Sequence, residues 1–311
     1  MPDLMKPGNM FVDDSRLYVT ENVHVYIYSL KDFKMIRKFG QHGEGPGEFV
    51  LDPNMLGLHI SRQDGEIMVH SHGKLSWFGM DGGFRRQIAT PIQYLMFVQA
   101  LGKHISARRL ISGKKRWQVI TIYDKKLKPV KEICRVKHLY QPGYGTDPLS
   151  MLPPAAVDKG LIYVIPDDSF TIQVFDKQGK AVSIIKRDEK RKAVTAKDRR
   201  EIINYFKNGV LTKDSFHIMK PFHFPSHFPA IRNMAVGDGK IFVVTNRIDA
   251  ENRNECLVLD LKGTLLKRTF VAMAETDLLE FSKFVFHKGS VYELVEDEEN
   301  EDWRLRITPV L

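Results

Sequence analysis

The sequence predicts an all-β protein, a six-bladed β-propeller of four-stranded antiparallel blades with one short helical insertion near residues 195–207. The main observation is a repeat: a short β-branched run, a polar turn, and a second run that ends in Asp and then Gly. The clearest copy covers residues 161–164 and 171–180. Several strands in a period of about 40 to 50 residues are typical of propeller blades.

The second and third strands of the repeats can be aligned along the chain. The second strands are expected at residues 17–19, 67–69, 105–107, 162–164, 241–243 and 291–293. The third strands follow at residues 25–28, 75–78, 119–123, 172–175, 257–259 and 305–307. Turns such as Asp176 to Gly179 connect them onward, because Asp caps its own backbone and Gly accepts positive φ. The connections are hairpins, so the sheets are antiparallel.

An Asn-Met dipeptide precedes three of these repeats and is expected to open the innermost strand of its blade. The amides are Asn9, Asn54 and Asn233. Only residues 1–8 precede the first inner strand, and the last repeat ends shortly after its third strand. We therefore expect a single domain over residues 1–311, in which the N-terminal stretch adds the outer strand of the last blade and removes an exposed edge.

One segment interrupts the repeat after residue 185. A charged run over residues 186–192 is followed by Thr195 and Asp198, which resemble a capping box, and by Gly209 as a stop signal. The apolar residues Ile202, Ile203, Tyr205 and Phe206 can share one face. We expect a short helix on the rim of the propeller.

The composition is that of a globular protein. Of 311 residues, 43% are hydrophobic and 27% are charged, and the net charge of +9 favours acidic partners. Cys134 and Cys256 stand in apolar runs, which predicts buried free thiols. No apolar run is long enough for a membrane-spanning segment, and the first residues lack a signal-peptide core. The chain is either cytosolic or an exported protein whose signal is absent from this sequence.

Residues 39–49 carry a family resemblance. The run Gly45-Pro46-Gly47-Glu48-Phe49 resembles the linker between blades of NHL-repeat propellers, and more narrowly of the bacterial TolB-like six-bladed family. The resemblance implies six blades and often an exported protein, hence a periplasmic or extracellular location, with a cytoplasmic one left open. Related propellers include lactonases and lyases as well as pure binding modules, so the fold leaves function open.

The stretch of residues 221–229 is the first candidate for a binding surface. It contains His223, Phe224, His227 and Phe228 between prolines, and it leads to the fifth inner strand and one mouth of the channel. The prolines forbid the helix on which two histidines four apart would chelate a metal. The alternative is that these aromatic side chains pack a long connection onto one face.

The three strand-opening amides, Asn9, Asn54 and Asn233, are the second candidate. Propeller enzymes of this kind hold a divalent cation with carboxylates and amides at the starts of inner strands. Three amides without a carboxylate are a poor cage for a hard cation, so we expect no metal, no cofactor and no catalytic residues. The amides either cap strand ends or bind a neutral polar ligand.

A pair of histidines and three basic clusters are weaker candidates for a binding site. His70 and His72 alternate in a strand-like stretch, but a metal would need a third ligand and a surface hairpin is the simpler interpretation. Basic clusters over residues 103–116, 125–137 and 186–200 can serve either a phosphate-binding face or solvated blade edges.

We therefore expect a non-catalytic binding propeller, exported and monomeric, that offers one face and the channel mouth to a protein, peptide or glycan ligand. The alternative from another class is a metal-assisted lyase or lactonase of the propeller type. A second alternative is a propeller that binds single-stranded RNA, which predicts affinity that falls steeply with salt.

Overall fold

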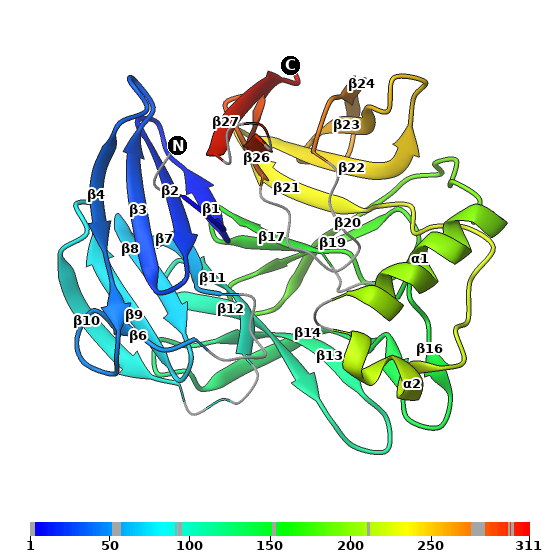
Figure 1. Cartoon of the computed structure of the whole chain (residues 1–311), viewed down its shortest axis with the longest axis horizontal. Helices are drawn as coiled ribbons and strands as arrows, with labels where there is room; N and C mark the ends of the chain where they lie inside the picture. Colours follow the sequence, from blue (N-terminus) through cyan, green and yellow to red (C-terminus); the bar gives the residue numbers. More distant parts are fainter. Residues whose placement is uncertain are drawn as a thin grey trace.

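A computed structural model describes residues 4–51, 57–90, 92, 95–150, 154–209, 212–274, 284–297, 299 and 302–311. Six antiparallel sheets of three or four strands follow one another along the chain and are arranged in a ring (Figure 1). The first strand of each sheet contacts the first strands of its neighbours in the order β1, β7, β11, β17, β21, β25 and back to β1. The ring is therefore closed, which confirms the predicted six-bladed propeller.

Five of the six sheets contain four strands, as expected. The first three blades consist of β1 (Met10–Val12), β2 (Arg16–Glu21), β3 (His24–Ser29) and β4 (Met35–Phe39); β7 (His59–Gln63), β8 (Glu66–Ser71), β9 (Lys74–Gly79) and β10 (Phe84–Ala89); and β11 (Leu95–Leu101), β12 (His104–Ile111), β13 (Trp117–Tyr123) and β14 (Pro129–Lys137). The fourth and fifth consist of β17 (Ala155–Asp158), β18 (Leu161–Val164), β19 (Thr171–Asp176) and β20 (Ala181–Lys186); and β21 (Asn233–Gly237), β22 (Lys240–Ile248), β23 (Asn254–Asp260) and β24 (Leu265–Val271).

The sixth sheet has three strands in the described residues: β25 (Phe284–His287), β26 (Ser290–Asp297) and β27 (Asp302–Pro309). Residues 4–9 do not form a strand beside it. Instead Trp303 Nε1 donates a hydrogen bond of 3.0 Å to the Met5 carbonyl, and Leu4 is buried with Trp303 and Tyr26 between the last and first blades. Residues 4–8 therefore do not supply the expected outer strand, and residues 1–3 lie outside the described part.

The linker after the first blade shows why its glycines and aromatic residues are needed. The ring centroids of Phe39 and Phe49 lie 4.5 and 5.8 Å from that of Phe78, so both side chains fix this linker between two blades. Gly40 has a φ of +91°, and a Cβ there would lie 2.4 Å from the Val23 carbonyl oxygen, so only glycine fits. The linker also contains the short parallel pair β5 (Gln41–His42) and β6 (Glu48–Phe49).

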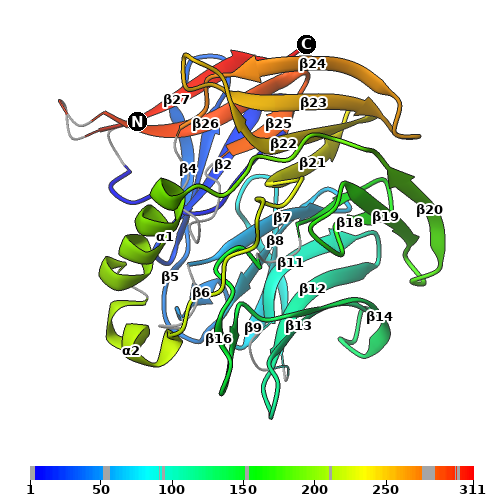
Figure 2. The ribbon, with the colours of Figure 1, turned by 90° about the vertical axis from the view of Figure 1, so that its right-hand side faces the viewer.

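The predicted helical insertion is α1 (Ala196–Asn208), and its capping box between Thr195 and Asp198 is present. Ile202 and Phe206 are buried on its inner face, while Ile203 and Tyr205 are half-buried. The sequence did not predict η1 (Lys213–Ser215) and α2 (Phe216–Met219), which are too short to show a periodic pattern. Figures 1 and 2 place α1 and α2 together at the periphery of the ring.

The second inner strand lies later in the chain than expected. It is β7 (His59–Gln63) and does not begin at Asn54, which lies outside the described residues. The hairpin between β7 and β8 turns at Asp64 and Gly65, both with positive φ, and this turn sets the register. Cys134 and Cys256 are buried free thiols, as predicted. Neither helix in the described part is long and apolar enough to span a bilayer.

Candidate functional site

Polar and aromatic side chains from three blades meet where the inner strands begin. Asn9 Nδ2 of the first blade lies 3.1 Å from His59 Nδ1 of the second. His59 pairs with His70 across β7 and β8, and their ring centroids are 6.4 Å apart. The Phe97 ring of the third blade lies 5.1 Å from that of His59, and the Arg108 guanidinium carbon lies 4.4 Å from the Phe97 centroid. We call these five residues the hub cluster.

A backbone irregularity brings Phe97 to this place. The pairing of β11 with β12 shifts register between Met96 and Gln99, and Phe97 lies in this bulge with a φ of +49°. The left-handed conformation is rare for a bulky residue and costs about 1–3 kcal/mol, and such strain concentrates at functional sites. The bulge interrupts the alternation of side chains along β11. The ring of Phe97, which lies in this bulge, contacts both His59 and Arg108.

Burial sets the charges of the hub cluster. It lowers the pKa of His59 to about 4, with a smaller contribution from the Arg108 charge, and it lowers the pKa of His70 to about 3. It also lowers the pKa of Arg108 to about 10, so that at neutral pH the guanidinium is charged and both imidazoles are neutral. His70 is 2% exposed, and its Nδ1 atom has no hydrogen-bond partner among the described residues.

The strand-opening amides have different environments. Asn9 belongs to the hub cluster. Asn233 is the first residue of β21, and its side-chain oxygen accepts a hydrogen bond of 2.7 Å from the Met234 backbone N–H, which is a capping contact. Asn54 lies outside the described residues. The structure therefore places one of the three candidates in a polar cluster and one in a strand-capping role.

The aromatic stretch of residues 221–229 divides into packed phenylalanines and histidines nearer the surface. Phe228 is buried and Phe224 half-buried in an apolar cluster with Phe206 of α1. His223 stacks on Tyr144 with centroids 4.2 Å apart, and its Nε2 lies 2.9 Å from the Tyr144 carbonyl oxygen. His227 is exposed. The phenylalanines thus help to hold the helices against the propeller, as the packing alternative supposed.

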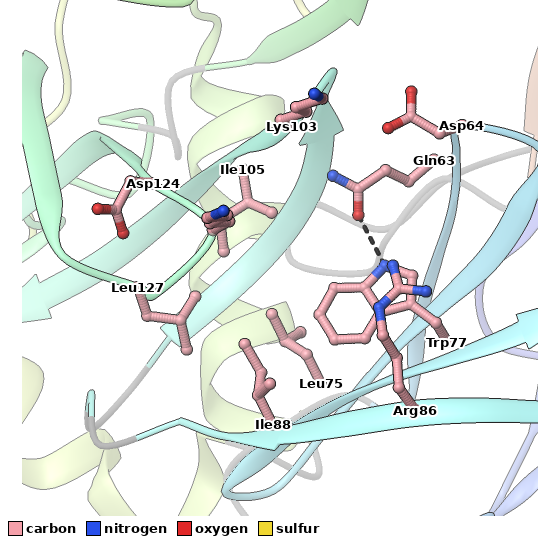
Figure 3. A pocket seen from close by; sticks show the side chains of 11 residues that line it. Gln63, Asp64, Leu75, Trp77, Arg86, Ile88, Lys103, Ile105, Asp124 and Leu127 are labelled. Atoms are coloured by element: carbon pink, nitrogen blue, oxygen red, sulfur yellow. Dashed lines mark hydrogen bonds between the residues drawn. The ribbon is translucent and has the colours of Figure 1, made fainter.

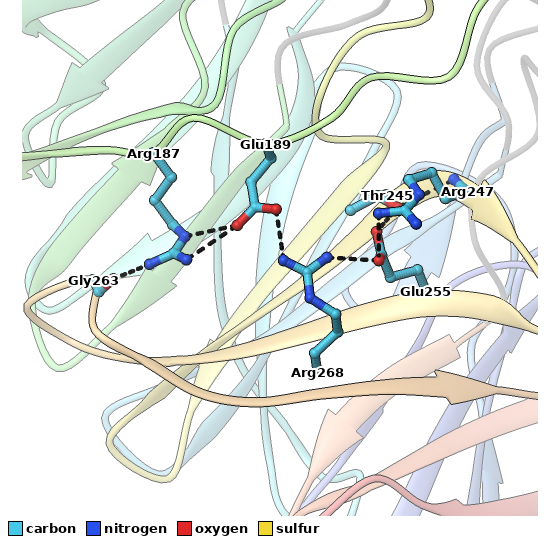
Figure 4. A network of polar contacts seen from close by, with 7 residues as sticks. All are labelled: Arg187, Glu189, Thr245, Arg247, Glu255, Gly263 and Arg268. Atoms are coloured by element: carbon cyan, nitrogen blue, oxygen red, sulfur yellow. Dashed lines mark hydrogen bonds and ion pairs between the residues drawn. The ribbon is translucent and has the colours of Figure 1, made fainter.

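A network of arginines and glutamates joins the fourth and fifth blades (Figure 4). Glu255 is 1% exposed and accepts bonds from Thr245 Oγ1 at 2.8 Å and from Arg268 at 2.6 Å, with Arg247 at 3.0 Å. Arg268 also contacts Glu189, in the linker after β20, at 2.6 Å. Burial raises the pKa of Glu189, but its hydrogen bonds and ion pairs with arginines outweigh burial and leave the pKa below its ordinary value.

Each carboxylate of this network has guanidinium partners, so the network serves to fasten the linker to the fifth blade. In the hub cluster, by contrast, the Arg108 guanidinium lies over the Phe97 ring. Three of its members, His59, Phe97 and Arg108, were not recognised in the sequence. His70 was, but as part of a surface hairpin, and it is buried. His72 alone of that pair is exposed.

Comparison with known proteins agrees with this architecture. A family model described as a 6-bladed beta-propeller matches residues 3–138. The chain is a six-bladed β-propeller. No curated protein matches it significantly.

Two solved structures from Bacteroides resemble this propeller. A protein from Bacteroides fragilis named as a "Putative exported protein" has a TM-score of 0.52 and 13% sequence identity, over 93% of this chain and 79% of the other. A protein of unknown function from Bacteroides caccae has a TM-score of 0.40 and 13% identity, over 92% and 82% of the two chains. At 13% identity the likeness to the Bacteroides fragilis protein concerns the fold alone.

Proposed function

We propose that the protein is a non-catalytic, exported binding propeller that presents the face of the hub cluster, with the channel mouth, to a protein, peptide or glycan ligand. The observation that carries the proposal is the strained Phe97, which supports a buried guanidinium beside two neutral imidazoles. A planar cation held on an aromatic ring keeps little rotational freedom. The guanidinium is therefore preorganised, and little further ordering is needed when a ligand binds.

The charges of the hub cluster favour binding over proton transfer. A general acid or base works best with a pKa near the operating pH, and the pKa values of His59 and His70 are about 4 and about 3. At neutral pH both rings stay uncharged; Asn9 Nδ2 already contacts His59 Nδ1, while His70 Nδ1 has no hydrogen-bond partner among the described residues. Such groups suit the recognition of carbonyl, hydroxyl or carboxylate oxygens, which peptides and glycans carry.

Export rests on two likenesses. Residues 39–49 resemble the linker of NHL-repeat and TolB-like propellers, a family whose bacterial members are often exported. The Bacteroides fragilis protein named as a "Putative exported protein" matches 93% of this chain. Fractionation of cells that express the full-length protein tests this part, and recovery in the cytoplasm would contradict it.

The binding role is tested by exposing the purified protein to arrays of extended peptides and of neutral and acidic glycans. Each ligand that binds is then titrated calorimetrically against the wild type and the Phe97→Ala and Arg108→Gln variants. We expect at least a tenfold loss of affinity in both variants. Arg135→Gln is the matched control, because Arg135 lies over Trp117 on the same blade but is exposed, and it should bind like the wild type. Equal affinity in all variants, or no binding to any array, would contradict the proposal.

A further inference from the structure

A cavity lies between the second and third blades, beside the hairpin that joins β7 to β8 and the hairpin that joins β11 to β12 (Figure 3). Its volume is about 290 Å³. The residues that line it are Gln63, Asp64, Leu75, Trp77, Arg86, Ile88, Lys103, Ile105, Asp124, Lys125 and Leu127. Small-molecule sites usually measure roughly 300–1,000 Å³, so this cavity suits a very small ligand.

The interior of this pocket is apolar and its walls are fixed. Leu75, Ile105 and Leu127 are buried in the cluster that joins the two blades. Trp77 Nε1 donates a hydrogen bond of 2.7 Å to Gln63 Oε1, so the indole N–H is already satisfied. The Arg86 guanidinium carbon lies 4.6 Å from the Trp77 ring. A ligand group that enters between these walls must therefore be apolar.

The rim carries both signs of charge. Asp64 is exposed and stands in the β7–β8 hairpin with a φ of +49°. Asp124 Oδ1 accepts the backbone N–H groups of Lys126 and Lys128 at 2.8 and 2.9 Å, which fixes that carboxylate and lowers its pKa. Lys103 and Lys125 are exposed beside them. Figure 3 shows Asp64 and Asp124 on opposite sides of the pocket, with Lys103 on the edge near Asp64.

We propose that this pocket binds a free aliphatic α-amino acid of the size of leucine or methionine. Its side chain enters the apolar interior, its ammonium group faces Asp64, and its carboxylate faces Lys103 and Lys125. Charge complementarity favours a zwitterion over an internal peptide residue, which carries neither charge. Exposed ion pairs contribute little each, so the affinity is modest and depends on salt. This site is independent of the hub cluster.

Trp77 supplies a direct readout of binding. The chain has three tryptophans, so the double variant Trp117→Phe/Trp303→Phe leaves Trp77 as the single fluorophore. Titration with L-leucine should change its emission in a saturable way. N-acetyl-leucinamide, which has the same side chain without either charge, should bind at least tenfold more weakly. Calorimetry of the unmodified protein with L-leucine repeats the measurement if the double variant is unstable.

A matched pair of variants tests the rim. Asp64→Asn should weaken L-leucine binding at least fivefold. Asp238→Asn should not, although Asp238 occupies the same place in the hairpin between β21 and β22, with a φ of +53° and a following glycine. The proposal is overturned if L-leucine gives no saturable signal in either assay. It is equally overturned if N-acetyl-leucinamide binds as tightly, which would indicate a site for internal peptide side chains, or if both Asn variants behave alike.

Discussion

The Arg108 guanidinium lies over the Phe97 ring, 4.4 Å from its centroid, and this contact joins a strained inner strand to a buried charge. Burying a cation costs free energy that a surface arginine does not pay. The left-handed backbone conformation of Phe97 is also unfavourable. A strained backbone in contact with a buried charge is expected where residues have been selected for binding and not for stability.

This relationship predicts that binding depends on the Arg108 charge. Arg108→Met removes the guanidinium and keeps most of its volume, so ligand binding should be lost while the free energy of unfolding falls by no more than ~2 kcal/mol. Calorimetry measures the first quantity and urea denaturation the second. Arg135→Met on the surface of the same blade should alter stability by no more than about 0.5 kcal/mol. A loss of more than about 2 kcal/mol in Arg108→Met would show that Arg108 has a structural role.

The hub histidines predict a specific dependence of stability on pH. Their folded pKa values, about 4 for His59 and about 3 for His70, lie below the ordinary value of 6.5. The unfolded chain therefore binds protons first, and stability is complete above pH 6.5 and falls as the pH drops toward 4. Each group contributes on the order of 3 kcal/mol to this loss.

Denaturant titrations between pH 7 and pH 4 should show the slope, and His70→Gln should reduce it. His42→Gln is the control, because His42 is exposed in the first linker. An imidazole of the hub that titrates near pH 6.5 by NMR would contradict this prediction.

The arginine–glutamate network predicts a separate acid limb. The lowered pKa of Glu189 means that its stabilisation is present above pH 4.5 and is lost as the pH falls through its folded pKa. Glu189→Gln should flatten the stability profile below pH 4.5 and leave the change between pH 6.5 and pH 5 intact. Thermal unfolding in a pH series checks this, and an unaltered acid limb would count against it.

Glu255 should matter more than Glu189 to stability at neutral pH. It is buried and accepts bonds from Thr245 and Arg268, so Glu255→Gln should lower the free energy of unfolding by ~1–3 kcal/mol. Glu251→Gln, an exposed residue near the same blade end, is the control. Equal effects of the two substitutions in urea denaturation would refute the assignment of the network as a fastening between blades.

The N-terminal cap of α1 can be tested on its own. Thr195→Ala removes the hydroxyl that accepts the Asp198 backbone N–H at 3.1 Å and should cost ~1 kcal/mol of local stability. Hydrogen exchange in the first turn of α1 measures this loss. Thr195→Ser keeps the cap and should restore most of the protection, and equal exchange in both variants would contradict the prediction.

Much of the fold followed from the sequence because its signals are local. Asp176 and Gly179 stand in one turn, and the Thr195 capping box stands at one helix start, so neighbouring residues suffice to predict them. The second inner strand was misplaced because the Asn54-Met55 dipeptide matched other repeats. The strand there is fixed by the Asp64 turn ten residues later.

The hub cluster could not be predicted in the same way. His59 and Phe97 come together only when two blades pack, and the contact depends on a bulge that leaves no composition signal in residues 96–99. The alternation of His70 and His72 was visible, but which ring is buried depends on where β8 ends. The hub cluster therefore depends on tertiary packing, while most strands could be predicted from local sequence signals.

The most direct test of the binding role is to incubate a ligand from the arrays with stoichiometric protein and then measure both its recovery by mass spectrometry and its affinity for Arg108→Gln. The ligand should be recovered unchanged from the wild type, and Arg108→Gln should bind it at least tenfold more weakly. A converted ligand, or full affinity in Arg108→Gln, would contradict the binding role.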